Sequence, residues 1–209
     1  MDFTQKTVPP GKTASTTVPV HPLLAERWSP RGFDRAHEIG DEALAALLEA
    51  ARWAPSAQNS QPWRFLVTRR GESAHDRLFA ALAPGNQAWA GRASALILVA
   101  ARTADDDGRA QPWALYDTGQ AVAALVTQAQ ADGLAAHQMG GFDTDAVRTG
   151  FGLGEALTPV VVLAIGRHDE DAGLPEPFAA RETAPRTRRP VGDLLLPAPA
   201  AREPAAPRA

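Results

Sequence analysis

Two uninterrupted apolar runs constrain the fold of this chain most strongly. They are ALILVAA at residues 95–101 and PVVVLAIG at residues 159–166. A strand with one face in water alternates apolar and polar residues, whereas a strand covered on both faces is apolar throughout. We therefore expect both runs to be central strands of a sheet with both faces covered. The segment WRFLVTR at 63–69 alternates large apolar residues with others, a pattern that suits a further strand.

Helical spacing appears upstream of the first strand. Apolar residues recur at i, i+3, i+4 and i+7 from about residue 41 to residue 53. Asp41 is the expected N-cap of this helix, and Pro55 is expected to stop it. The sequence thus predicts an amphipathic helix that packs one face on the sheet.

A second, longer helix is expected over residues 113–132, with Leu115 among the residues on its apolar face and Gly133 at its end. A short helix should follow Asp143, whose side chain would cap it. Helices and strands therefore mix without strict βαβ alternation. This order favours an α+β fold over a doubly wound parallel sheet.

Length and composition indicate one core flanked by two tails. The 209 residues suffice for one substantial domain, which we place at 21–196 without an internal boundary. Residues 1–20 are rich in Thr and Pro, and residues 197–209 are rich in Pro and Ala. Such segments bury too little surface to offset their ordering entropy, so we expect a disordered arm and a disordered tail.

Several function classes are disfavoured by composition. The formal net charge of −3 gives no field to hold nucleic acid or an anionic membrane. The chain has no cysteine, which excludes zinc–thiolate sites, and the acidic run 105–107 lacks the spacing of a calcium loop, so no metal is expected. There is no membrane-length apolar run and no signal core, which favours a cytoplasmic protein. Both lysines, Lys6 and Lys12, lie in the N-terminal arm, so an anion in the domain should be held by arginine, backbone amides or a helix N-terminus.

Two arginine motifs are candidates for anion binding. In ERWSPRGFD, the alternation of Arg27, Ser29 and Arg31 places two guanidiniums and a hydroxyl on one side of an extended backbone. Such a group binds a phosphate or a planar acceptor edge, although a solvated charged turn has the same pattern. In APRTRRPVGD, Arg186 and Arg188 would share one face of an extended strand and suit a terminal phosphate. A solvated basic stretch is the alternative.

The stretch RWAPSAQNSQPWRF at 52–65 concentrates uncharged hydrogen-bonding side chains between two apolar segments. Asn59 can donate and accept at once, as the edge of an amide–imide ring requires. Pro62 biases Gln61 toward an extended backbone, so the loop should feed directly into the following strand. The alternative is an ordinary polar connection between a helix and a strand.

A pair of glycines follows the long helix in HQMGGFD at 137–143. Gly140 and Gly141 would let the backbone approach a flat ligand and point its amides at it. A helix cap followed by a turn is the alternative. His137 is expected to be structural, and GFGLG at 150–154 fails as a dinucleotide loop because it follows a helix.

Five motifs in order then resemble one family. They are Arg-x-Ser-x-Arg, LLEAARWAPSAQNSQPWRF, YDTGQAVAALVTQAQADGL, GGFD and Arg-x-Arg-x-Pro, and together they resemble the nitroreductase family of FMN-dependent oxidoreductases over roughly residues 23–196. The resemblance implies a mainly antiparallel central sheet flanked by helices. It also implies an obligate homodimer in which the C-terminal segment crosses to the partner, with FMN sites built from both chains.

The same resemblance implies which residues contact FMN. They are Arg27, Trp28, Ser29, Arg31, Pro55, Ser56, Ala57, Asn59, Gly140, Gly141, Arg186 and Arg188. The arginines other than Arg31 would hold the phosphate end, the loop would come from the other chain, and the two glycines would lie near flavin N5. Many relatives carry lysine in place of Arg31, which is expected beside the pyrimidine edge of the flavin.

The implied activity is an NAD(P)H oxidoreductase in which the flavin, and no side chain, carries the hydride. NADH or NADPH would reduce FMN, and a nitroaromatic, quinone or activated-alkene acceptor would then take the hydride in a ping-pong cycle. A flavin store or redox sensor without turnover, and an atypical member that consumes its flavin, remain alternatives. Trp89 and Trp113 are candidates for stacking on the acceptor, and Trp113 could equally be a core residue at the start of a helix.

Overall fold

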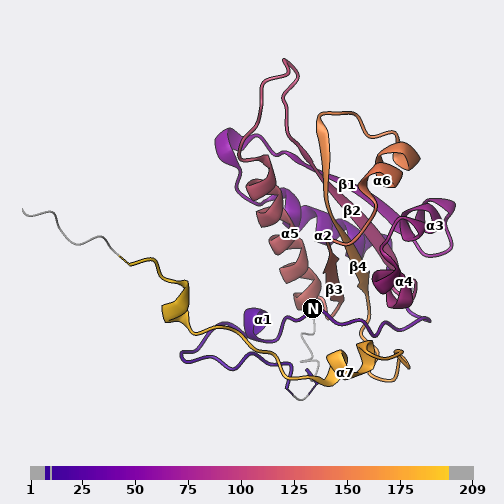
Figure 1. Cartoon of the computed structure of the whole chain (residues 1–209), viewed down its shortest axis with the longest axis vertical. Helices are drawn as coiled ribbons and strands as arrows, with labels where there is room; N and C mark the ends of the chain where they lie inside the picture. Colours follow the sequence, from indigo (N-terminus) through magenta and orange to yellow (C-terminus); the bar gives the residue numbers. More distant parts are fainter. Residues whose placement is uncertain (1–7, 10, 198–209) are drawn as a thin grey trace, which may run out of the picture.

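The computed structural model describes residues 8–9 and 11–197, so all of the tail expected at 197–209 except its first residue lies outside the described residues. Its centre is one antiparallel sheet with the order β1-β2-β4-β3. The strands are β1 (Trp63–Arg69), β2 (Ala95–Arg102), β3 (Ala135–Met139) and β4 (Leu157–Gly166). The α+β fold and the antiparallel sheet are as expected. The sheet is drawn in Figure 1.

The two apolar runs lie in the two central strands, β2 and β4, as expected. Both faces of the sheet are covered there. Ile97 belongs to the core on one face and Leu98 to the core on the other. The β1 strand is also covered on both sides. Thr68 is fully buried there, and its hydroxyl donates to the Leu96 carbonyl at 2.9 Å.

Helices cover both faces of the sheet. The helices of the structure are α1 (Pro22–Ala25), α2 (Asp41–Arg52), α3 (Ser73–Ala80), α4 (Pro84–Ala90), α5 (Ala114–Ala131), α6 (Thr144–Phe151) and α7 (Phe178–Thr183), with short 3₁₀ turns η1 (Ala57–Asn59) and η2 (Val191–Leu194). One core joins α2 and α5 to the sheet through residues such as Leu47 and Leu125. The other core joins α3, α4 and α6 through Leu78, Trp89 and Val147.

The ends of α2 and α6 illustrate how local sequence sets a helix. Asp143 caps α6 as expected, since its carboxylate accepts from the amides of Asp145 at 3.0 Å and Ala146 at 2.9 Å. The cap predicted for α2 is wrong. Gly40 is the N-cap, and Asp41 is the first helical residue, with its carboxylate paired to Arg69.

The long helix α5 lies where it was expected and ends before Gly133, whose φ of 68° is left-handed. The expectation that Leu115 lies on its apolar face is wrong, because Leu115 is 53% exposed. The buried face of the first turns consists of Ala114, Asp117 and Thr118 instead. Small and polar residues therefore occupy the inner face of its first turns. Among the described residues, no helix is both long and apolar enough to cross a membrane.

Part of the expected arm is attached to the domain. Lys12 is only 3% exposed, and its ammonium donates to the carbonyls of Arg181 at 3.1 Å and Ala184 at 2.7 Å. The composition of residues 1–20 did not predict this contact, since it is made by one cation and backbone carbonyls without any apolar periodicity. A lysine is thus part of the folded body after all.

Candidate functional site

Arginines from two distant segments come together beside α1 and α7. We call Arg27, Arg31, Arg186 and Arg188 the arginine cluster. Burial lowers the pKa of Arg27, and the nearby positive charges of Arg186 and Arg188 lower it further. Among the ion pairs of the described residues, none involves a member of the cluster. Burial lowers the pKa of Arg31, and the charge of Glu182 opposes that shift, whereas positive charges alone act on Arg27 and Arg186. Like charges gathered in this way indicate a site for an anion.

The guanidinium of Arg186 is oriented by backbone. Its Nη1 donates to the carbonyls of Lys12 at 2.8 Å and Ala25 at 2.7 Å. These two bonds use both hydrogens of Nη1 and leave the edge formed by Nε and Nη2, the edge that grips a phosphate bidentately. Arg27 donates to the Ser29 hydroxyl at 3.3 Å, so these two predicted neighbours also meet. The strand expected around Arg186 and Arg188 is wrong, because this stretch has no strand pairing.

A buried carboxylate that the sequence did not single out holds the backbone beside Arg31. Glu182 accepts from the amides of Arg31 and Gly32, each at 2.9 Å. Burial would raise the pKa of Glu182, but His168, whose Nε2 lies 3.5 Å from Oε1, and the hydrogen bonds from these amides outweigh burial and lower it. At Gly32 a Cβ atom would come closer than 3.0 Å to the Asp169 carbonyl oxygen, so the chain needs glycine there.

The side chain of Arg31 continues from the cluster toward the sheet. Its guanidinium carbon lies 6.0 Å from the ring centroids of both Trp89 and Phe178. Trp89 in turn lies 4.4 Å from the ring of His137, whose Nδ1 is 2.9 Å from the Pro30 carbonyl oxygen. His137 is therefore structural, as expected. Trp89 is 1% exposed and packs in the core, so it is not the exposed stacking residue that the sequence suggested.

The two glycines follow β3 directly. The Gly141 carbonyl accepts from the amide of Ala83 at 3.0 Å and from Asn86 Nδ2 at 2.9 Å, which fixes the turn against α4. A Cβ at Gly141 would lie 3.2 Å from Asn86 Nδ2, whereas one at Gly140 would meet nothing within 4 Å. Gly141 is thus closely packed, whereas Gly140 leaves its surface open.

The polar loop, residues 55–61, has an unusual backbone. Gln58, Asn59 and Gln61 have φ of 53°, 55° and 45°, in the left-handed region that residues other than glycine seldom adopt. The extended conformation expected for Gln61 is therefore wrong. Its amide donates to the Ser56 hydroxyl at 3.0 Å, a bond that favours the turn over the bias imposed by Pro62. Strain of this kind gathers at binding sites.

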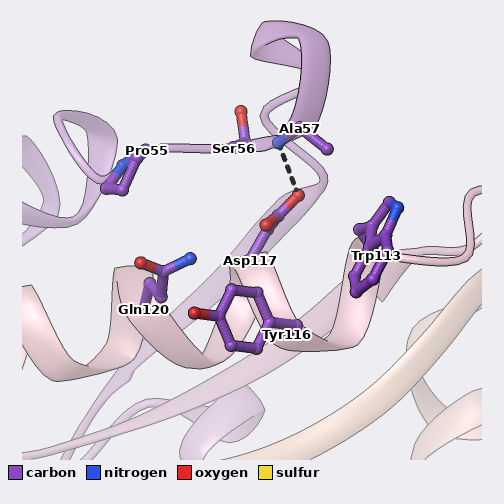
Figure 2. Close-up of a pocket in the computed structure, with 7 residues that line it drawn as sticks. All are labelled: Pro55, Ser56, Ala57, Trp113, Tyr116, Asp117 and Gln120. Atoms are coloured by element: carbon purple, nitrogen blue, oxygen red, sulfur yellow. Dashed lines mark hydrogen bonds between the residues drawn. The ribbon is translucent and has the colours of Figure 1, made fainter. Parts of the chain in front are cut away.

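Asp117 of α5 anchors this loop. Its carboxylate is 3% exposed and accepts from the Ala57 amide at 2.9 Å. A shallow hollow of about 340 Å³ opens here between the loop and the first turns of α5 (Figure 2). The residues that line it are Pro55, Ser56, Ala57, Trp113, Tyr116, Asp117 and Gln120. Trp113 is exposed instead of being a core residue, and with Tyr116 it offers flat aromatic surface at the hollow.

The structure brings the arginines together but keeps them away from the polar loop. The loop packs at the N-terminal end of α5, whereas α1 and the segments with the arginines lie near its C-terminal end (Figure 1). Because α5 has 18 residues, these ends are separated by about 27 Å. The arginine cluster and the polar loop are therefore two separate groups within one chain. In the part of the chain that the structure describes, no three potential metal ligands gather.

The chain is similar to known proteins over most of its length. The model of the nitroreductase family matches residues 24–87 and 72–167. This chain belongs to the nitroreductase family. It is 31% identical over 195 residues to a putative NADH dehydrogenase/NAD(P)H nitroreductase of Leptothrix cholodnii, covering 83% of this chain and 93% of that protein.

Two solved structures have similar folds. One, described as an oxidoreductase containing FMN, has a TM-score of 0.83 at 33% identity, with 91% of this chain and 97% of that chain covered. A putative nitroreductase in complex with FMN from Desulfovibrio desulfuricans has a TM-score of 0.69 at 27% identity, with 87% and 99% covered. The family membership and the fold thus agree with the resemblance seen in the sequence.

Proposed function

We propose that this member of the nitroreductase family is an FMN-dependent NAD(P)H oxidoreductase. Its acceptors would be nitroaromatics, quinones or activated alkenes, reduced in a ping-pong cycle. The observation that carries the proposal is the arginine cluster, in which Arg27, Arg186 and Arg188 lie together without a carboxylate partner among the described residues. A terminal phosphate is the anion that such a donor set fits best.

The chain fits FMN at both ends of the cofactor. Arg27, Ser29, Arg186 and Arg188 would hold the phosphate and the start of the ribityl chain. Arg31 would supply positive charge at the pyrimidine edge, where it favours the reduced, anionic ring, and Trp28 would border it. The turn at Gly140 and Gly141 is open enough on the Gly140 side for a flat ring to approach the backbone.

The polar loop would complete the site of a partner chain. Its residues Pro55, Ser56, Ala57 and Asn59 are too far along α5 to reach the arginine cluster of their own chain. Two copies packed so that each loop meets the other's cluster would make two complete sites. We therefore include a homodimer in the proposal.

The C-terminal segment supports the same arrangement. After α7 the chain leaves the body and runs outward to η2 (Figure 1). Its large apolar residues are exposed: Val191, Leu194, Leu195 and Leu196. Exposed apolar side chains on an extended segment favour burial against another chain. In the proposed dimer this segment crosses to the partner.

Bound FMN supplies the hydride chemistry, taking a hydride from NAD(P)H and passing it to the acceptor. The protein positions the reactants and controls access to the ring. Trp113 and Tyr116 present aromatic faces beside the polar loop, suited to a flat acceptor. Asn59 would pair with the polar edge of the ring, and Asp117 would keep the loop in place.

The first test is an absorption spectrum of the purified protein before and after anaerobic NADH or NADPH. A flavin band that bleaches, followed by steady NAD(P)H oxidation with a quinone or nitroaromatic, is expected. A band that neither nucleotide bleaches would instead indicate a flavin store or sensor. Loss of intact flavin by mass analysis after aerobic reduction would indicate a flavin-consuming member.

Substitution in the cluster tests the phosphate site. Arg188→Ala removes a charge-assisted hydrogen bond worth about 1.5–3 kcal/mol, so FMN affinity should fall by about 10- to 150-fold in fluorescence titrations. Arg189→Ala is the matched control, because it removes the same charge from the adjacent position and is expected to leave the affinity within about twofold. Equal losses in both variants would refute the assignment of Arg188.

A further inference from the structure

We propose that residues 11–14 form a strap that fixes the phosphate end of the flavin site, with Lys12 as its positioning residue. This inference rests on the proposed function and adds to it a segment that lies outside the motifs of the family. The strap runs between the two segments that supply the arginine cluster. Its contacts reach both of them.

Backbone hydrogen bonds attach the strap on each side. The Ala14 amide donates to the Ala25 carbonyl at 2.8 Å, two residues before Arg27. The Arg186 amide donates to the Gly11 carbonyl at 3.3 Å. Without the strap, residues 25–27 and residue 186 would lose the element that lies between them.

The strap also sets the direction of one guanidinium. Arg186 Nη1 donates to the Lys12 carbonyl at 2.8 Å and to the Ala25 carbonyl, which itself accepts from the Ala14 amide. These three hydrogen bonds form one connected set. Since both hydrogens of Nη1 are used, the Nε–Nη2 edge of Arg186 is held in one orientation.

The side chain of Lys12 locks the strap in place. Its ammonium donates to the carbonyls of Arg181 and Ala184, at the C-terminal end of α7, where a cation is favoured by the helix dipole. The ring of Trp28 covers the same ammonium, with its centroid 4.6 Å from Nζ. Lys12 thus joins α7, Trp28 and the strap at a single point.

The charge of Lys12 favours the binding of an anion at the site. Burial lowers the pKa of Lys12, Glu182 opposes that shift, and the neighbouring charges of Arg31 and Arg186 lower it further. Repulsion from the arginines destabilises the charged form of a buried lysine, and a bound anion would offset that repulsion. A phosphate in the cluster would supply that compensation, which links its binding to the order of the strap.

Comparing the binding of FMN with that of riboflavin distinguishes a role at the phosphate from a general effect on stability, because riboflavin has the same ring and ribityl chain but no phosphate. Dissociation constants for both should be measured on wild type, on Lys12→Met and on Lys6→Met. Lys12→Met should weaken the binding of FMN by about tenfold, which is the loss expected when one charge-assisted hydrogen bond to the phosphate is misplaced. The same substitution should weaken the binding of riboflavin by less than about twofold. Lys6→Met, the matched control, makes the same change at the other lysine of the chain and should leave both constants unchanged.

A second measurement covers the case in which Lys12→Met folds poorly. Amide hydrogen exchange of wild type should show stronger protection of Ala14 and Arg186 with FMN than with riboflavin. Equal protection by the two flavins, equal weakening of both in Lys12→Met, or the same FMN loss in Lys6→Met would each overturn the strap. A wild-type protein that binds neither flavin would overturn the proposed function itself, whereas normal FMN binding by Lys12→Met would overturn the strap alone.

Discussion

The bond between Asp117 and the polar loop can be tested without any cofactor. Asp117→Ala removes a buried carboxylate that accepts from the Ala57 amide at 2.9 Å. A hydrogen bond to a charged group contributes about 1.5–3 kcal/mol. A non-glycine residue in the left-handed region costs about 1–3 kcal/mol, so this one bond offsets roughly one of the three such residues in the loop. We expect the free energy of unfolding to fall by about 1.5–3 kcal/mol.

Thermal unfolding followed by circular dichroism at fixed protein concentration measures this loss. For a chain of this size the melting temperature should fall by about 3–12 °C. Asp117→Asn keeps an oxygen acceptor without the charge and should lose about half as much free energy. In hydrogen exchange, the Ala57 amide of Asp117→Ala should lose about 10- to 150-fold protection.

Asp132→Ala provides the matched control, since Asp132 lies exposed at the other end of the same helix and its carboxylate accepts from the side chain of Gln128. Its stability should stay within about 0.5 kcal/mol of wild type. If Asp117→Ala melted at the same temperature as Asp132→Ala, or if the exchange of Ala57 were unaltered, the loop would not depend on Asp117.

Three further predictions concern packing, pH and the flavin edge. Gly32→Ala should lower the free energy of unfolding, measured in urea, by about 1–3 kcal/mol because its Cβ would press on the Asp169 carbonyl oxygen. Gly85→Ala is the control and should not be destabilised, because a Cβ at Gly85 would meet nothing within 4 Å. Equal stabilities of the two variants would contradict the packing argument. Burial lowers the pKa of His137 from 6.5 to about 4, so its neutral form stabilises the fold above pH 6.5 and that stability is lost as pH falls toward 4. The resulting slope, about 1.4 kcal/mol per pH unit, should be missing from unfolding curves of His137→Gln, and identical slopes would show that His137 contributes nothing. Asn59→Ala should shift the reduction potential of bound FMN, measured by dye equilibration, more than it weakens binding, and an unchanged potential would remove Asn59 from the ring edge.

The sequence predicted the elements whose physics is local. The β2 and β4 strands were predictable because short, continuous apolar runs such as 95–101 and 159–166 are typical of strands covered on both sides. The cap at Asp143 was evident because its carboxylate meets amides two and three residues ahead. The β3 strand was missed, since its residues AAHQM have little preference for strands and are held by pairing with β4.

The candidate site was predictable in its residues but not in its supports. Arg27, Arg186 and Arg188 stood out as motifs, and the structure gathers them. Asp117 and Glu182 gave no signal, because a single carboxylate on a helix is usually solvated and their partners are backbone amides 60 and 151 residues away. Contacts between distant segments come from the tertiary fold, which no local pattern encodes.

The separation of the polar loop from the arginine cluster along α5 has a genetic consequence. In the proposed dimer, a copy with a damaged loop still offers an intact cluster, and a copy with a damaged cluster still offers an intact loop. Two alleles, each inactive alone, would together form mixed dimers with one complete site and one doubly damaged site. Such alleles would complement each other, whereas two alleles with damage in the same half would not.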